Sequence, residues 1–555
     1  SATKYTEKFY ASTFTQLTES SQNGLYGISE MTDRQIYADF LVNVNKRFGE
    51  DWSLQVNLGT SISDMYYDAL KNRGPIADGE MSDERAGLAN VFNVQNLSNS
   101  TKTTRLQEGW REQTQSVFGS AEVGYKGAYY LTLTARNDWP SQLAGPHSNR
   151  KSFFYPSIGG SVVLSQIIPN MPENLEYVKI RGSYASVGTA FERYIANPMY
   201  QWNASGLSWN TQTQYPVYDL KPELTDSFEV GLSLRFLKWF SLDATYYRTN
   251  TKNQTFNPQI STGSGSSDIF IQSGDVLNQG TEVTLRFGKT WDKFTWNSNY
   301  TFSFNQNRIM SLADNVMNPA TGETFSVSQL DMNGLGLAHF ILREGGTLGD
   351  LYSLADFQYD TNGRIVVNED GSVTPKTFSS SDDYVKLGSV LPKSNMSWRN
   401  DFSIGGFNFG FLITARIGGI VYSSTQAILD YYGVSEASAE ARDRGGVLIN
   451  GGDLIDANRW YSSVGGSNPL PQEYTYSATN VRLQEASIGY TIPKKVLGNV
   501  CDLTLSVVGR NLWMIYNKAP FDPESIATTG NYYQGIDHFM MPSLRSFGFN
   551  VRMTF

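Results

Sequence analysis

The sequence Ser543-Leu-Arg-Ser-Phe-Gly-Phe-Asn-Val-Arg-Met-Thr-Phe555 alternates in character from residue to residue. One parity carries Arg545, Phe547, Phe549, Val551, Met553 and Phe555, and the other carries Ser546, Gly548, Asn550, Arg552 and Thr554. This period of two predicts a β-strand with one apolar face that ends on an aromatic residue. Such a strand could be the last strand of a soluble β-sandwich or of a bacterial outer-membrane barrel, and the rest of the chain has to distinguish them.

Composition narrows the class of protein. The 555 residues include 32 Tyr, 31 Phe, 11 Trp and 50 Gly, helix signals are nearly absent, and the net charge is −9. An acidic chain without a cluster of Lys and Arg is unsuited to nucleic acid, so nucleic-acid binding is not expected. The sequence contains no run of about eighteen apolar residues, so a transmembrane helix is not expected. Strands that alternate would average to the observed mean hydropathy of −0.35, so a membrane barrel stays open.

Residues 34–48 and 51–63 give the clearest strand pattern, joined by the short turn Gly49-Glu50. Both segments exceed ten residues, whereas strands of soluble proteins usually have five or six. Strands of this length suit a tilted crossing of the hydrocarbon layer. The same pattern predicts sixteen strands in all: 1–15, 34–48, 51–63, 111–125, 129–139, 153–164, 176–187, 223–236, 240–250, 278–287, 292–305, 395–404, 407–417, 481–491, 501–513 and 543–555.

The predicted connections alternate between short and long along the whole chain. The short ones are 49–50, 126–128, 165–175, 237–239, 288–291, 405–406 and 492–500. Every connection between them is longer, and the longest are 306–394 and 418–480. An antiparallel barrel with tight turns at one end and large loops at the other has the polarity of outer-membrane proteins. The sequence therefore favours an all-β, transmembrane antiparallel β-barrel over a soluble sandwich.

Eight motifs occur in order along the chain. They are Ala135-Arg-Asn-Asp-Trp139, Ser152-Phe-Phe-Tyr-Pro-Ser157, Lys179-Ile-Arg-Gly-Ser-Tyr-Ala-Ser-Val-Gly188, Leu220-Lys-Pro-Glu-Leu-Thr-Asp-Ser-Phe-Glu-Val-Gly231, Glu344-Gly-Gly-Thr-Leu-Gly-Asp-Leu-Tyr352, Leu429-Asp-Tyr-Tyr-Gly433, Arg482-Leu-Gln-Glu-Ala-Ser-Ile-Gly-Tyr490 and Gly509-Arg-Asn-Leu-Trp513. Taken together and in this order, these motifs resemble the SusC/RagA family of TonB-dependent outer-membrane transporters of Bacteroidetes. The resemblance extends from about Trp52 to Phe555.

This resemblance implies a 22-stranded barrel with an N-terminal plug, a TonB box and a SusD-like surface lipoprotein as a lid. The chain differs from that pattern, because it shows sixteen strands and neither a plug-like stretch nor a TonB box. Residues 1–555 are therefore interpreted as the C-terminal part of such a transporter β-barrel, and the start at Ser1 as a cut or processed end. The plug, which would contact TonB, and about six strands would lie outside this chain.

Sequence motifs for catalysis and for metal binding are absent. The three histidines, His147, His339 and His538, are far apart, and Cys501 is the single cysteine. None of the sequence patterns of hydrolases, zinc proteases or phosphate-binding loops occurs. No enzyme activity, cofactor or metal is expected. The segment Asp360–Gly371 collects oxygen ligands but lacks the spacing of a calcium loop, so a hairpin with two Asx-Gly turns is the preferred interpretation.

Aromatic residues of the long loops are the candidate substrate-binding residues. They are Trp202, Trp209, Tyr215 and Tyr218 in one loop, Tyr431 and Tyr432 in a second, and Tyr532 and Tyr533 in the last. Flat rings stack on sugars and also hold peptide side chains, so they would suit an oligosaccharide or a peptide. The alternative, which has the greater weight, is that these rings pack the loops together or against the lid.

The functional hypothesis is a SusC-like outer-membrane nutrient importer of a Gram-negative, Bacteroidetes-like bacterium. It would take up oligosaccharides or peptides in a TonB-dependent manner, with a SusD-like lipoprotein as partner and outer-membrane lipid around it. The alternatives are a passive sixteen-stranded porin and a surface-adhesion barrel.

Overall fold

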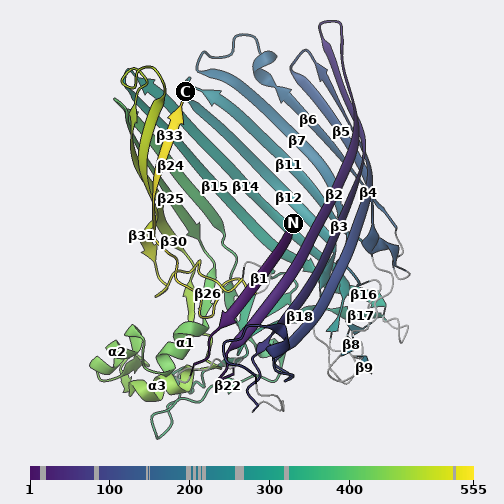
Figure 1. The fold of residues 1–555 in the computed structure, drawn as a ribbon. Coiled ribbons are helices and arrows are strands. Elements are labelled where there is room, and N and C mark those ends of the chain that lie inside the picture. The colour runs from purple at the N-terminus through teal and green to yellow at the C-terminus, as the bar shows by residue number, and fades with distance from the viewer. Residues whose placement is uncertain are drawn as a thin grey trace.

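The computed structural model describes residues 1–12, 21–79, 87–145, 148, 151–195, 202–203, 208–209, 214–215, 221–256, 268–317, 324–528 and 533–555. All sixteen predicted strands are present, and they pair in chain order in one antiparallel sheet (Figure 1). Their bounds are β1 Ala2–Phe9, β2 Leu25–Phe48, β3 Trp52–Pro75, β4 Thr104–Tyr125, β5 Tyr129–Pro140, β6 Phe153–Val163, β7 Leu175–Thr189, β11 Glu223–Phe236, β12 Phe240–Phe256, β14 Ile271–Trp291, β15 Phe294–Ser311, β24 Ser394–Ile404, β25 Phe407–Ile417, β30 Asn480–Ile492, β31 Asp502–Asn517 and β33 Ser546–Thr554.

Several strands are longer than predicted, mostly on the side of the long loops, although β14 also continues through the predicted turn 288–291 to Trp291. β2 begins at Leu25 rather than at residue 34, and β3 continues to Pro75 rather than to residue 63. The pairing of β2 with β3 runs without a register shift from Phe48–Trp52 to Leu25–Pro75. Beyond the hydrocarbon layer neither face has to be apolar, so the alternation fades while the hydrogen-bond ladder continues. The predicted strand 1–15 was too long, because β1 ends at Phe9.

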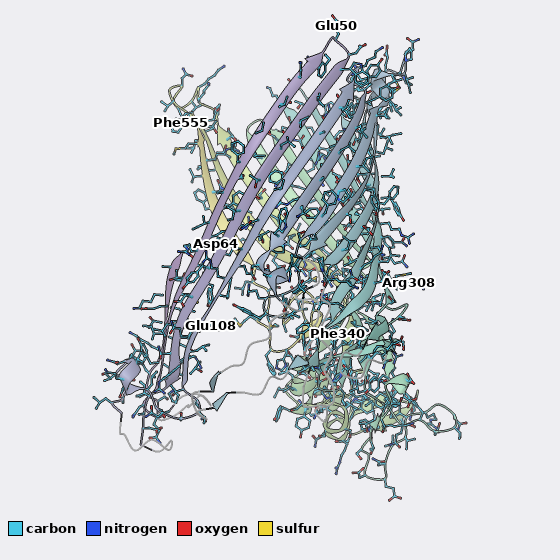
Figure 2. The ribbon with its side chains drawn as sticks, turned by 90° about the vertical axis from the view of Figure 1, so that its right-hand side faces the viewer. Glu50, Asp64, Glu108, Arg308, Phe340 and Phe555 are labelled. Atoms are coloured by element: carbon cyan, nitrogen blue, oxygen red, sulfur yellow. The ribbon has the colours of Figure 1, made fainter. Side chains whose placement is uncertain are left out.

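The polarity of the connections is confirmed. Glu50, in the β2–β3 turn, and the C-terminal Phe555 lie toward one end of the sheet, and Phe340, in a long connection, lies toward the other (Figure 2). The two-residue turn Gly405–Gly406 between β24 and β25 has both residues at positive φ, +55° and +93°. Glycine adopts this conformation without steric cost, which permits a two-residue connection.

The sheet has one apolar and one polar face. Residues such as Leu133, Ile158, Val230 and Val507 expose more than 40 % of their surface on one side. The alternate positions carry hydrogen-bonded polar residues, for example Asn57 with Ser120 and Thr132 with Glu122. Only an apolar exterior is stable against lipid, so the apolar face is the outer face of the barrel wall.

The two edges of the sheet are β1 and β33, and they are not paired with each other. The pairing begins with β1 on β2 and ends with β33 on β31. Figure 1 shows the curved wall with these two strands at its margins.

The long connections contain further elements where loops were predicted. They are β8 Trp202–Asn203, β9 Ser208–Trp209, β10 Gln214–Tyr215, β13 Asp268–Ile269, β16 Ala313–Met317, β17 Thr324–Val327, β18 Gln329–Leu335, β19 Ala338–Arg343, β20 Asp350–Ser353, β21 Ala355–Asp356, β22 Lys376–Thr377, β23 Val385–Ser389, β26 Ile420–Ser423, α1 Ser424–Tyr431, α2 Glu436–Asp443, β27 Val447–Ile449, β28 Asp453–Ile455, α3 Ala457–Val464, β29 Thr475–Ser477 and β32 Ile536–Asp537.

The three helices were not predicted, because each is only eight residues long and too short for a periodic apolar pattern. Side chains cap all three at the first turn: Ser423 for α1, Ser435 for α2 and Asp456 for α3. Within the described residues, no helix has the length and apolarity needed to cross a membrane.

Candidate functional site

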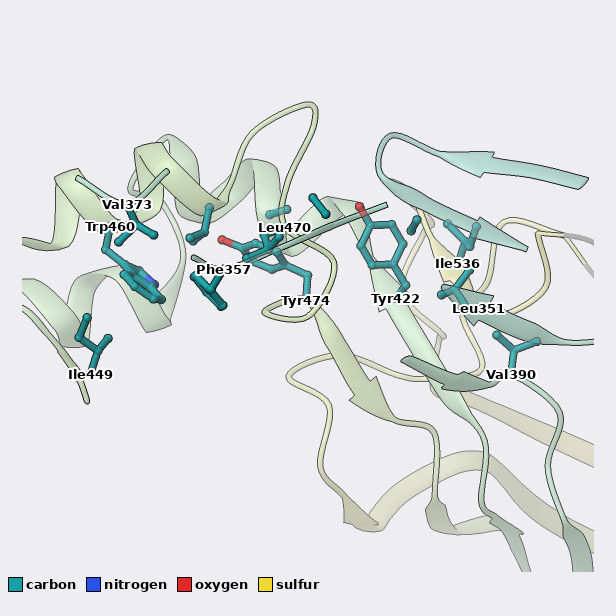
Figure 3. Packing of buried hydrophobic residues seen from close by; sticks show 14 of the residues in the cluster. Leu351, Phe357, Val373, Val390, Tyr422, Ile449, Trp460, Leu470, Tyr474 and Ile536 are labelled. Carbon is teal, nitrogen blue, oxygen red and sulfur yellow. The ribbon is translucent and has the colours of Figure 1, made fainter. Parts of the chain in front are cut away.

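The two longest connections fold together into one unit, here called the loop body, which comprises residues 329–389, 420–477 and Ile536. Its sheets are the four-stranded β18-β19-β20-β23 and the three-stranded β29-β26-β32. A single cluster of buried side chains, among them Leu351, Tyr422, Trp460 and Ile536, joins these sheets to α1 and α3 (Figure 3), and Phe340 belongs to the same cluster. The loop body therefore has a hydrophobic core of its own.

Aromatic packing fixes the helical side of the loop body. The rings of Phe357 and Trp460 stack with centroids 5.6 Å apart and planes 20° apart. Trp460 lies on the buried side of α3 together with Ala457 and Val464. The position of α3 is thus set by the connection between β15 and β24, to which Phe357 belongs.

A buried carboxylate joins α1 to α2. Asp430 is 4 % exposed, and its Oδ1 accepts hydrogen bonds from Gln426 Nε2 at 2.7 Å and from Ser435 Oγ. Burial raises the pKa of Asp430, although both hydrogen bonds oppose the shift. Since Ser435 also caps α2, Asp430 orients the start of that helix.

The last long connection is held by an ion pair with little solvent exposure. Arg482, on β30, donates to both carboxylate oxygens of Asp522 and lies 3.3 Å from Glu524 Oε2. Ser543 Oγ, just before β33, also donates to Asp522, at 2.6 Å. Burial acts to raise the pKa of Asp522, but the hydrogen bonds from Arg482 and Ser543 outweigh it and hold the pKa below its usual value.

The preferred interpretation of Asp360–Gly371 as two turns is confirmed. The amide of Gly363 donates to Asp360 O and that of Gly371 donates to Asn368 O, and both glycines have positive φ. The Asp360 carboxylate accepts from the amides of Asn362 and Arg364, so it serves the turn. Within the described residues there is no group of three or more His, Cys, Asp or Glu side chains placed to hold a metal.

The structure separates the predicted loop aromatics into groups. Tyr431 and Tyr432 end α1 with their rings 5.2 Å apart and nearly perpendicular, and they are 43 % and 71 % exposed. Tyr533 is 39 % exposed and lies edge-on to the buried Phe340. Tyr533 therefore has the packing role that was the alternative interpretation.

Three other predicted aromatic residues, Trp202, Trp209 and Tyr215, lie in short strand pairs after β7. Trp202 in β8 pairs directly with Trp209 in β9, and Tyr215 in β10 pairs with Ile269 in β13. Tyr218 and Tyr532 lie outside the described residues. None of these observations tests a contact with substrate.

Charged clusters on the inner face were missed by sequence reasoning. Arg181 of β7 donates to both carboxylate oxygens of Asp243 of β12, at 2.9 and 3.1 Å. Arg399 of β24 and Arg510 of β31 both donate to the carboxylate of Glu485 between them. Alternation places these residues on the polar face, but their meeting depends on the cross-strand register, which the alternation does not specify.

A further cluster on the polar face lies where β3 and β4 leave the membrane. The rings of Tyr67 and Trp110 stack 5.8 Å apart, and the guanidinium of Arg193, from the connection after β7, lies 4.0 Å from the Trp110 ring centre. Arg193 also donates to Glu112 at 2.6 Å. A flat aromatic surface beside charged groups is a chemistry that suits a polar oligomer.

Three comparisons relate the chain to known proteins. The family described as TonB dependent receptor-like, beta-barrel matches residues 2–512. Among curated relatives, TonB-dependent receptor P3 of Formosa agariphila is 23 % identical and covers 88 % of this chain, and receptor P39 of the same organism is 24 % identical and covers 90 %. The chain spans about half the length of these relatives, 50 % and 51 %.

The fold agrees with a solved structure of the same class. The RagAB peptide transporter superposes with a TM-score of 0.74 at 16 % identity, over 100 % of this chain and 58 % of that one. RagAB in its closed-closed state gives 0.72 over 96 % of this chain. At 16 % sequence identity, the similarity to RagAB establishes a shared fold and nothing about function.

The apolar outer face, the polarity of turns and loops and the family match together define the location. The wall is integral to the outer membrane of a Gram-negative bacterium, with turns toward the periplasm and the loop body outside the cell. The chain belongs to the TonB-dependent receptor-like β-barrel family.

Proposed function

We propose that residues 1–555 form most of the wall of a TonB-dependent outer-membrane importer of oligosaccharides or peptides. The observation that carries the proposal is the sixteen-stranded sheet with two unpaired edges, which matches part of the longer RagAB chain. The protein performs transport and no chemistry of its own.

Unpaired edges support the completion of the wall by further strands. Within the part of the chain that the structure describes, β1 and β33 each present one row of backbone N–H and C=O groups without a partner strand. In hydrocarbon such groups cost several kcal/mol each, so a stable wall has to be closed. About six additional strands and a plug, supplied from outside this chain, close a 22-stranded barrel of the transporter class.

The same observation disfavours the passive porin. A sixteen-stranded porin would close by pairing its first strand with its last, whereas here β1 and β33 are not paired with each other. The plug region of the complete protein contacts TonB, which supplies the force for uptake.

The loop body supports a partner outside the cell. Leu448 and Leu454 form a direct cross-strand pair in the β27–β28 hairpin and are 67 % and 56 % exposed. Val434, after α1, is 68 % exposed. Large apolar side chains on a separately folded outer unit form a surface on which a SusD-like lipoprotein docks as a lid.

The proposed substrate is an oligosaccharide or a peptide, which exposed aromatic side chains of this protein would bind. Tyr431 and Tyr432 outside the membrane, and the Tyr67–Trp110 stack with Arg193, line the route that the substrate takes toward the lumen. The solved relative is a peptide importer, and rings and guanidinium groups suit peptides and sugars alike.

The experiment is purification of the native protein from its membrane, followed by intact mass measurement, N-terminal sequencing and identification of co-purifying chains. A polypeptide near twice this length, or a bound fragment containing a plug, together with a lipoprotein, is expected. A lone chain of 61.9 kDa that conducts ions in a planar bilayer would contradict the importer in favour of a porin.

Docking of the lid is tested separately with Leu448→Asp and Leu454→Asp. Both variants are expected to lose the co-purifying lipoprotein, because each places a charge in an apolar contact. Val496→Asp is the matched control, since Val496 is 70 % exposed but lies in the β30–β31 connection on the periplasmic side. Retention of the lipoprotein by both loop-body variants would exclude this surface as the docking site.

A further inference from the structure

The outer face of the wall is hollowed across β25, β30, β31 and β33. The hollow is a groove of about 570 Å³, lined almost entirely by apolar side chains, among them Phe411, Ile488, Trp513 and Phe547. This volume falls within the range of pockets that hold small molecules. The groove opens away from the lumen, so it does not belong to the proposed transport route.

The cross-strand register explains the shape. Phe411 pairs with Ala486, Ala486 pairs with Gly509, and Gly509 pairs with Phe547, which makes one row across four strands. Ala486 and Gly509 thus lie between the two larger phenylalanines, so the outer surface is recessed at these two small residues. The next row toward the turns, Phe409, Ile488, Val507 and Phe549, carries large side chains at every position.

Irregular pairing shapes the extracellular end of the groove. The β30–β31 register shifts between Leu483 and Glu485, and Asn511 of β31 has a φ of +53°. A bulge of this kind bends its strand and redirects the side chains beside it. Leu512 consequently lies over Gly509, where an added Cβ would be 2.7 Å from Leu512 Cδ2. Glycine at position 509 therefore leaves room for the Leu512 side chain, which a larger residue there would displace.

The depth of the groove in the membrane follows from strand geometry. Ala486 lies six residues from the end of β30 at Ile492, and Phe411 lies four residues from the start of β25 at Phe407. With a rise of about 3.3 Å per residue and a tilt of about 45°, the floor is roughly 9–14 Å from the turns. The hydrocarbon band is about 25 Å tall, so the groove lies within it and reaches the periplasmic leaflet.

We infer that this groove is a binding site for one acyl chain of a phospholipid. The lining offers apolar and aromatic contacts to a flexible chain and almost no hydrogen-bonding group that would favour water. Phospholipids supply the hydrocarbon of the periplasmic leaflet, which the groove reaches. A chain held in the groove contacts protein on three sides, in contrast to the single contact that a flat lipid-facing strand provides.

The test uses the native protein in nanodiscs that contain a phosphatidylethanolamine with a diazirine on one acyl chain. After illumination, cross-linked peptides are identified by mass spectrometry. Peptides containing residues 483–488 and 507–513 are expected to carry more adduct than the peptide containing residues 117–123 of β4. Equal labelling of these lipid-facing segments would overturn the inference.

Ala486→Phe fills the floor and is expected to reduce labelling of the groove by roughly tenfold, which corresponds to about 1.4 kcal/mol of binding free energy. The control is Ala121→Phe, because Ala121 is also on the outer face, between Val56 and Leu133, at a similar depth. It should leave labelling of the groove unchanged. Undiminished labelling in Ala486→Phe would overturn the inference.

Folding of the variants is verified by heat-modifiable migration, and Ala486→Leu provides a milder substitution with the same expected direction. Native mass spectrometry then identifies what the protein retains. A retained phospholipid that Ala486→Leu loses supports the site. A retained lipid A, or a protein chain cross-linked to the groove, would replace the phospholipid as occupant. Transport does not enter the assay, so its result is independent of the proposed function.

Discussion

Arg482 and Asp522 form an ion pair that is almost fully buried. Arg482 Nη2 donates to Asp522 Oδ1 at 2.8 Å, and the two side chains are 5 % and 11 % exposed. Arg482 belongs to the barrel wall, and Asp522 to the last long connection. Removal of one partner leaves the other charge buried, which typically costs about 3–5 kcal/mol. Arg482→Met should therefore release residues 518–545, measured as faster amide hydrogen exchange in that segment.

The matched control for this release is Arg364→Met. Arg364 and Asp453 are 2.6 Å apart, but their side chains are 51 % and 46 % exposed, so the pair contributes about 0–1 kcal/mol. Exchange near residues 360–364 should change little. Equal effects of the two substitutions would show that burial does not set the strength of the Arg482–Asp522 pair.

Anchoring of the same connection should depend on pH. The folded pKa of Asp522 is below its unfolded value of about 3.9, so its stabilising contribution is complete above that value. It is lost as the pH falls through the lower folded pKa. Digestion by pepsin, which is active in acid, should therefore cut residues 518–545 increasingly below about pH 4. In Asp522→Asn the susceptibility should already be present at the highest pH tested and vary little.

The buried carboxylate of the loop body predicts the opposite pH dependence. The folded pKa of Asp430 is raised by burial, so the folded state binds more protons and stability decreases as the pH rises from about 4 through that pKa. Asp430→Asn should stabilise the loop body at pH 7, because both observed hydrogen bonds are accepted by Oδ1, which an amide oxygen can replace. Local exchange in α1 and α2 reports the change.

Asp443→Asn, at an exposed position in α2, is the control for Asp430→Asn and should leave the pH dependence intact. If the stability of the loop body did not change between pH 4 and pH 7, the role assigned to Asp430 would be contradicted.

Core truncation should separate the loop body from the wall. Phe340 is fully buried in the loop-body cluster, and Phe→Ala in a core costs about 3–5 kcal/mol. Phe340→Ala should increase exchange throughout residues 329–389 and 420–477 while heat-modifiable migration of the barrel stays normal. Phe539→Ala, at a 55 % exposed position, is the control. Loss of the barrel signal in Phe340→Ala would mean that the two parts fold as one.

The assignment of the faces predicts an asymmetry between neighbouring residues. Leu133 is on the outer face, so Leu133→Arg near the middle of the membrane should cost about 2–4 kcal/mol. Thr134 points to the inner face, where its hydroxyl pairs with Ser157, and Thr134→Arg should cost much less. Urea titration of the barrel in detergent or lipid measures both, and a reversed order would exchange the two faces.

The strands could be predicted because one face must be apolar for lipid, which leaves a period of two in segments such as 223–236. The loops have no such constraint. Trp460 is buried in the loop-body cluster, where Phe357, about a hundred residues earlier, stacks on it, and no local sequence pattern predicts that contact. The Arg181–Asp243 pair likewise depends on the register of strands that are separated in sequence.

Substrate binding by the loop aromatics stays a prediction, and the structure shows only how exposed some of these rings are. Tyr431 and Tyr432 are exposed as a vestibule would need, whereas Tyr533 packs against Phe340. The Tyr67–Trp110–Arg193 cluster was missed because residues 64–75 and 104–110 were taken as loop, although both segments continue the strands.

The separate core of the loop body has an evolutionary consequence. Substitutions that reshape what the outer surface recognises can be tolerated by Phe340, Trp460 and their neighbours without disturbing the hydrogen-bond ladder in the membrane. The outer module and the wall can then change independently, so that, for the proposed importer, one membrane scaffold can acquire new cargo through changes in its outer module.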